Sequence, residues 1–257
     1  MKMHLDTIPL WDSVRLEGEC PLCALRRKLE LGEVERFLGA SVMEPDVRIL
    51  VNREGFCQKH QGMLFSAGNR LGHALMMQTH LQETRKQQEK LLASLRGAAD
   101  NAAALTLKDK VNGKEGKVLA SITDIGEKME HPGCVVCESI QENMDRYLYT
   151  FFHLYGHDAD FQEALSKSKG FCVPDVGLLL EKAPAQLNHK ELADFCRLLA
   201  GLTEQNLSRL QEDIDWFIKK FDYRFEAEPW GNSRDAVERT VNKLNGWCVG
   251  QEPNPKE

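Results

Sequence analysis

Six of the eight cysteines in this 257-residue chain fall in two short patterns that occur twice. The step between the two patterns is 34 positions in the first half, from Cys23 to Cys57, and 35 in the second, from Cys137 to Cys172. Cysteine, histidine and aspartate are all zinc ligands, so the patterns predict metal sites. The near-equal steps predict a duplicated unit. The patterns are Cys20-Pro-Leu-Cys23, Gly55-Phe56-Cys57-Gln-Lys-His60, Cys134-Val-Val-Cys137 and Gly170-Phe171-Cys172-Val-Pro-Asp175.

The first half predicts a closed metal site with the ligands Cys20, Cys23, Cys57 and His60. A Cys-x-x-Cys pair at a helix start directs two thiolates the same way, and the helix N-terminus helps to keep them deprotonated. A Cys-x-x-His pair at a second helix start offers two more donors, because positions i and i+3 share a face. Three thiolates and one imidazole are typical of a structural zinc site. The alternative without metal is two buried cysteine pairs beside a surface histidine.

The second half predicts a related site with Cys134, Cys137, Cys172 and Asp175 as ligands. Asp175 stands where the first half has a histidine, and three cysteines with one aspartate are an uncommon closed set. This site is therefore expected to be weaker, differently loaded or empty. Three histidines are alternatives for its fourth ligand: His131, His157 and His189.

The leading hypothesis is a metal-binding protein with zinc in a structural or regulatory role that acts by binding a partner, and two other kinds of chemistry compete with it. Three cysteines with a histidine or aspartate can hold an iron–sulfur cluster, and Cys20 with Cys23 can form a redox-active thiol pair. The third hypothesis is a metal-dependent enzyme that uses the second cluster, where Asp175 leaves a coordination position open for water. No pattern in the sequence nominates a general base with a partner, so no catalytic residue is predicted.

Composition and charge favour an ordinary cytoplasmic protein. The net charge of −6 argues against a nucleic-acid partner and an anionic membrane surface. No signal peptide is expected in residues 1–14, and no stretch reaches the roughly 18–20 apolar residues that span a bilayer. A reducing compartment makes a disulfide framework improbable, so metal binding is the better account of the cysteines. The expected partner is another protein.

Apolar periodicity predicts an all-α fold of two pseudo-symmetric halves, each organised on a cysteine-rich cluster and ending in a long helix. The first repeat is expected at residues 1–96, with a long helix that ends near residue 95. A linker is expected at 97–133, where glycine and asparagine interrupt the pattern. The second repeat is expected at 134–225, and a C-terminal helix and tail at 226–257. Asn188 and Glu191 predict a capping box at the start of the last long helix.

The chain resembles a family of uncharacterised bacterial proteins, mainly from low-GC Gram-positive bacteria. Its members carry a Cys-Pro-x-Cys block followed by Gly-Phe-Cys-x-x-His, and then a second such pair. The resemblance extends over nearly the whole chain, including Phe221-Asp222-Tyr223-Arg224 and Pro229-Trp230. Some members carry an automatic label of ABC transporter substrate-binding protein, which this sequence does not support. The resemblance implies a shared architecture, from which Asp175 departs.

Overall fold

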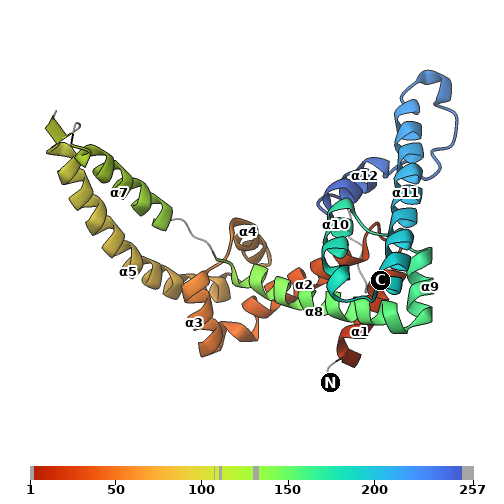
Figure 1. Cartoon of the computed structure of the whole chain (residues 1–257), viewed down its shortest axis with the longest axis horizontal. Coiled ribbons are helices and arrows are strands. Elements are labelled where there is room, and N and C mark those ends of the chain that lie inside the picture. Colours follow the sequence, from red (N-terminus) through yellow and green to blue (C-terminus); the bar gives the residue numbers. More distant parts are fainter. Residues whose placement is uncertain (1–2, 107, 110–111, 130–132, 251–257) are drawn as a thin grey trace. The chain divides into compact units, whose positions relative to one another are not determined.

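The structure is a computed structural model that describes residues 3–106, 108–109, 112–129 and 133–250. Within these ranges the regular elements are eleven α-helices and three short 3-10 helices, and there is no strand (Figure 1). The prediction of an all-α fold is therefore confirmed. None of the helices in these ranges combines the length and the apolar character needed to cross a bilayer.

The chain divides into two compact units, which are described separately. Unit 1 comprises residues 1–30 and 140–257, and unit 2 comprises residues 31–139. The division falls inside helix α2 (Pro21–Leu38) and helix α8 (Val135–His157), so each of these helices contributes residues to both units. Unit 1 is thus discontinuous in sequence, which differs from the two consecutive repeats that we expected. The duplication itself stays a prediction.

Unit 2 is a set of helices that follow one another closely along the chain. Helix α5 runs to Ala103, past the boundary expected at residue 96, because its last turns are rich in alanine, the strongest helix former. Helix α7 lies within the expected linker and packs along α5. Most of the described residues between 97 and 129 are therefore helical. The elements are η1 (Ala40–Met43), α3 (Pro45–Glu54), α4 (Gln58–Ser66), α5 (Arg70–Ala103) and α7 (Lys114–Met129).

Unit 1 is built around a cluster of aromatic rings. Phe151 on α8 makes edge-on contacts with Phe161, Phe171 and Phe195, at centroid distances of 5.5, 5.8 and 6.2 Å. These four side chains are almost fully buried. Such ring pairs contribute about 0.5–1.5 kcal/mol each beyond the area that they bury. The helices wholly within the unit are α1 (Met3–Arg15), α9 (Ala159–Lys167), α10 (Val173–Lys182), α11 (His189–Lys219) and α12 (Ala236–Asn245).

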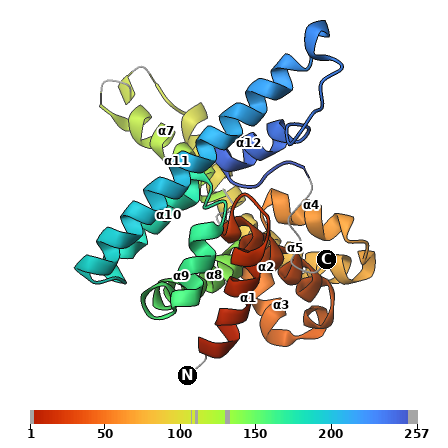
Figure 2. The ribbon, with the colours of Figure 1, turned by 90° about the vertical axis from the view of Figure 1, so that its right-hand side faces the viewer.

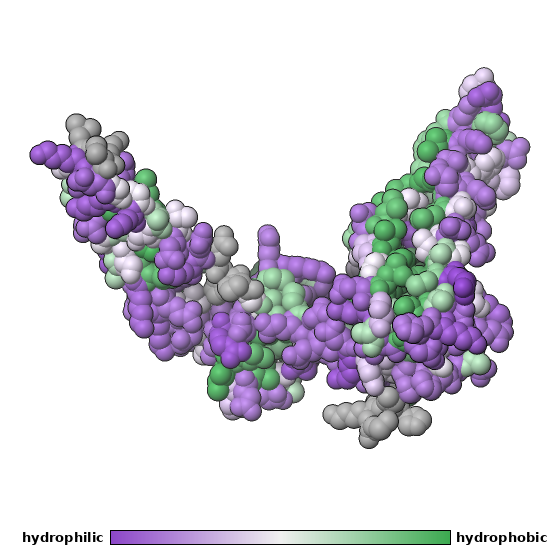
Figure 3. Space-filling view, in the orientation of Figure 1, coloured by the Kyte–Doolittle hydropathy of each residue, from purple (hydrophilic) through white to green (hydrophobic). Residues whose placement is uncertain are grey.

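Helix α11 begins at the predicted capping box. The side chain of Asn188 accepts hydrogen bonds from the backbone N–H groups of Lys190 and Glu191, and the Glu191 carboxylate accepts from the N–H of Asn188. Helix α12 lies beside α11 and also contacts α10, as Figures 1 and 2 show together. Figure 3 shows apolar residues gathered over α10 and α11, where Val173, Leu180 and Leu207 are exposed.

Candidate metal sites

Four helix starts supply the eight predicted ligands in the same way. In each case one residue directly precedes the helix and the other is its third residue. Side chains at these positions lie near the free N–H groups of the first turn, where the helix dipole favours negative charge. A thiolate or carboxylate is therefore stabilised at each start. The pairs are Cys20 and Cys23 on α2, Cys57 and His60 on α4, Cys134 and Cys137 on α8, and Cys172 and Asp175 on α10.

A glycine and a phenylalanine form the turn before two of these helices. Gly55 and Gly170 both have a φ of 67°, a conformation that glycine adopts without steric cost. The next residue packs into the core of its own unit. Phe56 lies edge-on to Phe37 at 5.4 Å, and Phe171 lies edge-on to Phe151. The Gly-Phe-Cys sequence therefore combines a left-handed glycine with a core phenylalanine directly before the ligand cysteine.

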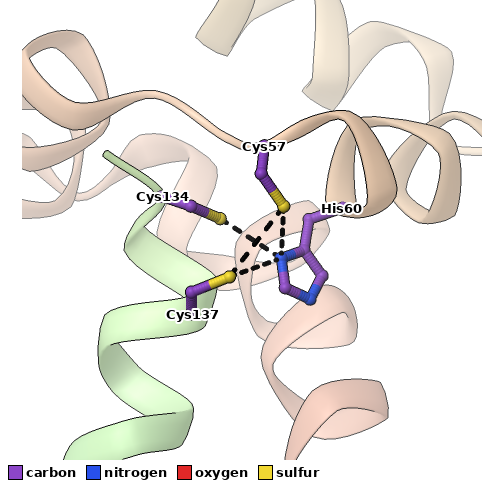
Figure 4. A group of neighbouring side chains, drawn as sticks. All are labelled: Cys57, His60, Cys134 and Cys137. Carbon is purple, nitrogen blue, oxygen red and sulfur yellow. Dashed lines mark hydrogen bonds between the residues drawn. The ribbon is translucent and has the colours of Figure 1, made fainter. Parts of the chain in front are cut away.

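The donor group of unit 2 consists of Cys57, His60, Cys134 and Cys137. Figure 4 shows that Nδ1 of His60 points toward all three sulfur atoms. Its distances to the Sγ atoms of Cys57, Cys134 and Cys137 are 3.2, 3.2 and 3.4 Å, and Cys57 Sγ lies 3.9 Å from Cys137 Sγ. His60 and Cys134 are buried, Cys57 is half-buried and Cys137 is exposed.

The donor group of unit 1 consists of Cys20, Cys23, Cys172 and Asp175, all of them buried. A single carboxylate oxygen, Oδ2 of Asp175, lies 3.1, 3.5 and 3.2 Å from the sulfurs of Cys20, Cys23 and Cys172. Cys23 Sγ is 3.7 Å from Cys172 Sγ. Asp175 thus takes the place in this group that His60 takes in the other.

Both groups have the dimensions of a tetrahedral ion site. Zinc bonds of about 2.3 Å to sulfur and about 2.0–2.2 Å to nitrogen or oxygen, at tetrahedral angles, separate the donor atoms by about 3.5–3.8 Å. The distances given above are 3.2–3.9 Å in unit 2 and 3.1–3.7 Å in unit 1. All four donor atoms of each group lie within 4.8 Å of one another. Each group can therefore hold a single metal ion.

Three further contacts surround the group of unit 1. Arg26 donates from Nη2 to Oδ1 of Asp175 at 2.8 Å and from Nη1 to Oδ2, the oxygen directed at the sulfurs, at 3.5 Å. The backbone N–H of Trp247 donates to Cys23 Sγ at 3.3 Å. Lys243, which is 1% exposed, donates from Nζ to the carbonyls of Glu19 and Lys169, just before the two ligand-bearing turns. Outer contacts of this kind orient metal ligands.

Different hydrogen bonds connect the two ligand-bearing turns in each unit. In unit 2 the N–H of Val135, the residue after Cys134, donates to the carbonyl of Gly55 at 3.1 Å. The equivalent residue after Cys20 is Pro21, which has no N–H. In unit 1 the ammonium of Lys243 provides the link between the two turns.

The partition of the ligands between the two sites was predicted wrongly. The sequence suggested that each half closes its own site, but each Cys-x-x-Cys pair lies with the second ligand pair of the other half. Helix α2 has 18 residues, which gives it a length of about 27 Å. Its first residues belong to unit 1, and the residues after it belong to unit 2. Cys57 therefore meets the start of α8, and Cys172 meets the start of α2. Among the described residues, His157 and His189 belong to neither group, and His131 lies outside those residues.

Hydrogen bonds within each group favour one thiolate. In unit 1 the hydrogen bonds that Cys23 shares with Cys172 and Cys20 lower its pKa to about 2, whereas burial raises the pKa of Cys20 well above its usual value. In unit 2 burial opposes ionisation of Cys134, but hydrogen bonds from His60 and from backbone N–H groups lower its pKa to about 6. Burial and the neighbouring Cys134 raise the pKa of Cys137 to about 12.

The surrounding residues were missed by the sequence analysis, although one signal was present. Arg26 lies one helical turn after Cys23, so its side chain can reach the same helix start. Lys243 and Trp247 carried no such signal, because only the folded chain brings the end of α12 to Cys20 and Cys172. A lysine on a short amphipathic helix is ordinarily solvated.

The fold and the two donor groups define an all-helical protein with two candidate metal sites. A family model described as "Family of unknown function (DUF6062)" matches residues 1–251, so the chain belongs to this family. This agrees with the expected resemblance to an uncharacterised family. No curated protein and no solved structure matches the chain.

Proposed function

We propose that the protein binds two zinc ions, one in each donor group, and that both ions are structural. The observation that carries the proposal is the convergence of four donor atoms within 4.8 Å in each unit. Each group gathers side chains from two helix starts that are far apart in sequence. An ion there would tie α4 to α8 in unit 2 and α2 to α10 in unit 1.

The donor types favour zinc over other ions. Thiolate and imidazole are soft or intermediate ligands that suit zinc, whereas calcium and magnesium prefer oxygen. An iron–sulfur cluster inserts several iron and sulfide atoms between its cysteine ligands, so it needs donors farther apart than around one ion. The spacing in both groups supports a mononuclear site.

The number of donors favours a structural role over catalysis. Four protein ligands complete a tetrahedral zinc site, and catalytic zinc keeps one position for water or substrate. The enzyme hypothesis required Cys134, Cys137, Cys172 and Asp175 to converge, and these residues are divided between two groups. The protein would therefore act by presenting zinc-stabilised helices to a protein partner. A cytoplasmic location would keep the ligand thiols reduced.

Elemental analysis tests this proposal on full-length protein prepared without chelator or affinity-tag metal. We expect two zinc ions per chain in the wild type and one in each of Cys57→Ser and Cys172→Ser. The controls are Cys196→Ser and Cys248→Ser, because these cysteines lie in neither group, and both variants should keep two zinc ions. Iron with sulfide, or a metal-free protein with eight free thiols, would overturn the proposal.

A further inference from the structure

The two donor groups differ in their access to solvent. In unit 2 Cys137 is exposed and Cys57 is half-buried. In unit 1 Cys20, Cys23 and Cys172 are at most 6% exposed. The segment after α12 lies over that group, since a Cβ atom added to Gly246 would lie 3.8 Å from Cys23 Sγ and 3.9 Å from Cys172 Sγ. A small oxidant from solvent therefore reaches the thiols of unit 2 first.

The two accessible sulfurs of unit 2 are also close to each other. Cys57 Sγ and Cys137 Sγ are 3.9 Å apart, although the residues are separated by 80 positions. A disulfide bond needs about 2.05 Å between the sulfurs, so the pair must approach by less than 2 Å. Cys57 directly precedes α4 and Cys137 lies within α8, and rotation of the two side chains about χ1 can supply this approach.

We propose that Cys57 and Cys137 are a peroxide-sensitive pair whose disulfide releases the metal ion of unit 2 while unit 1 keeps its ion. This inference rests on the proposed function, because it assigns a regulatory chemistry to one of the two zinc sites. Thiolate character and exposure together determine which cysteines are oxidised first. With zinc bound all three cysteines of unit 2 are deprotonated, so exposure decides among them, and Cys137 has the most exposed side chain and is the first target.

The chemistry balances with hydrogen peroxide as the oxidant. The Cys137 thiolate attacks one peroxide oxygen, the O–O bond breaks, and the departing hydroxide takes a proton to become water. The resulting sulfenic acid is attacked at sulfur by the Cys57 thiolate, the S–O bond breaks, and the second hydroxide leaves as water after protonation. Each sulfur loses one electron and the peroxide gains two. His60 and Cys134 remain as the only two donors, which is too few for a closed zinc site.

Zinc release and thiol mapping test the inference on zinc-loaded full-length protein in which Cys196 and Cys248 are replaced by serine. After hydrogen peroxide treatment a chromophoric chelator should detect one of the two zinc equivalents. Peptide mapping after alkylation should find a disulfide between Cys57 and Cys137. A thiol reductant with added zinc should restore two ions per chain.

Two variants provide matched controls because each holds one ion. Cys172→Ser, with zinc only in unit 2, should release all of its zinc, and Cys57→Ser, with zinc only in unit 1, should release none. A third variant, Cys137→His, replaces the thiol by another zinc donor and should retain zinc under peroxide. If it does not fold, the peptide map of the parent protein still decides the outcome.

The possible failures are distinguishable. Protein that contains no zinc before treatment would contradict the proposed function itself. Two zinc ions at the start that are both retained, or that are released at equal rates, would contradict this inference and leave the proposed function intact. A disulfide between Cys134 and Cys137 in place of the expected one would also overturn it.

Discussion

Arg26 holds one oxygen of Asp175 through a 2.8 Å hydrogen bond, and the other oxygen of that carboxylate faces three cysteine sulfurs. The arginine also donates to that second oxygen at 3.5 Å, so it orients the whole carboxylate beside the sulfurs. Arg26→Gln should weaken zinc binding in unit 1 by about 10- to 100-fold, the usual effect of losing an outer contact to a ligand. Chelator competition in a Cys57→Ser background measures this site alone. Arg197→Gln, at an exposed pair with Asp194, is the control, and equal affinities in both variants would contradict the assignment.

Lys243 links the two ligand-bearing turns of unit 1 from a nearly fully buried position. Lys243→Met keeps most of the length of the side chain but leaves the carbonyls of Glu19 and Lys169 without this donor. Hydrogen bonds from charged groups contribute about 1.5–3 kcal/mol each, so the free energy of unfolding should fall by about 3 kcal/mol. Urea denaturation measures this free energy of unfolding. Lys190→Met, on the exposed side of α11, should change it little, and equal effects would refute the role of Lys243.

Replacing a glycine by alanine should have opposite effects on stability in the turn at Gly55 and inside helix α4. At Gly55 an added Cβ would lie 2.7 Å from Nε2 of His80, whose ring is held by a 3.0 Å hydrogen bond from Nδ1 to the carbonyl of Asn52. Gly55→Ala should therefore lower the free energy of unfolding by about 2 kcal/mol or more. Gly62→Ala in helix α4 meets no neighbour and should raise it by up to about 1 kcal/mol. Thermal unfolding of both variants measures these changes. A Gly55→Ala protein that is more stable than the wild type would contradict the turn geometry.

The thiolate of Cys134 predicts a pH-dependent signal in metal-free protein. Its pKa of about 6 lies below the usual value of 9.0, so its contribution to stability is complete above pH 9 and is lost as the pH falls through 6. Thiolate ultraviolet absorbance should drop with a midpoint near pH 6. The step should vanish in Cys134→Ser and persist in Cys196→Ser. A wild-type titration without a step below pH 8 would contradict the hydrogen bonding described for this group.

Much of the site could be predicted from residue types and spacing, because the helix-start positions of Cys-x-x-Cys and Cys-x-x-His pairs are local properties. The helical fold and the capping box at Asn188 are local in the same sense. The partition of ligands is not local. Steps of 34 and 35 residues, and a set of three cysteines with one other donor, are the same whether each half closes its own site or the halves exchange partners.

The outer contacts were also beyond local reasoning. Whether Lys243 is solvated or buried depends on where α12 docks, and that docking is a tertiary property of unit 1. The end of the long helix in the first half also depends on more than local signals. Gly97 suggested a break, but the alanines around it sustain α5 to Ala103, and packing against α7 supports the extension.

The pairing of ligands across the two halves is the central claim, and zinc counts in double variants test it most directly. Cys57→Ser with Cys134→Ser removes two ligands from one group, so this protein should retain one zinc ion. Cys20→Ser with Cys57→Ser removes one ligand from each group and should retain none. One zinc ion in the second variant and none in the first would show that each half closes its own site, contrary to the arrangement described here.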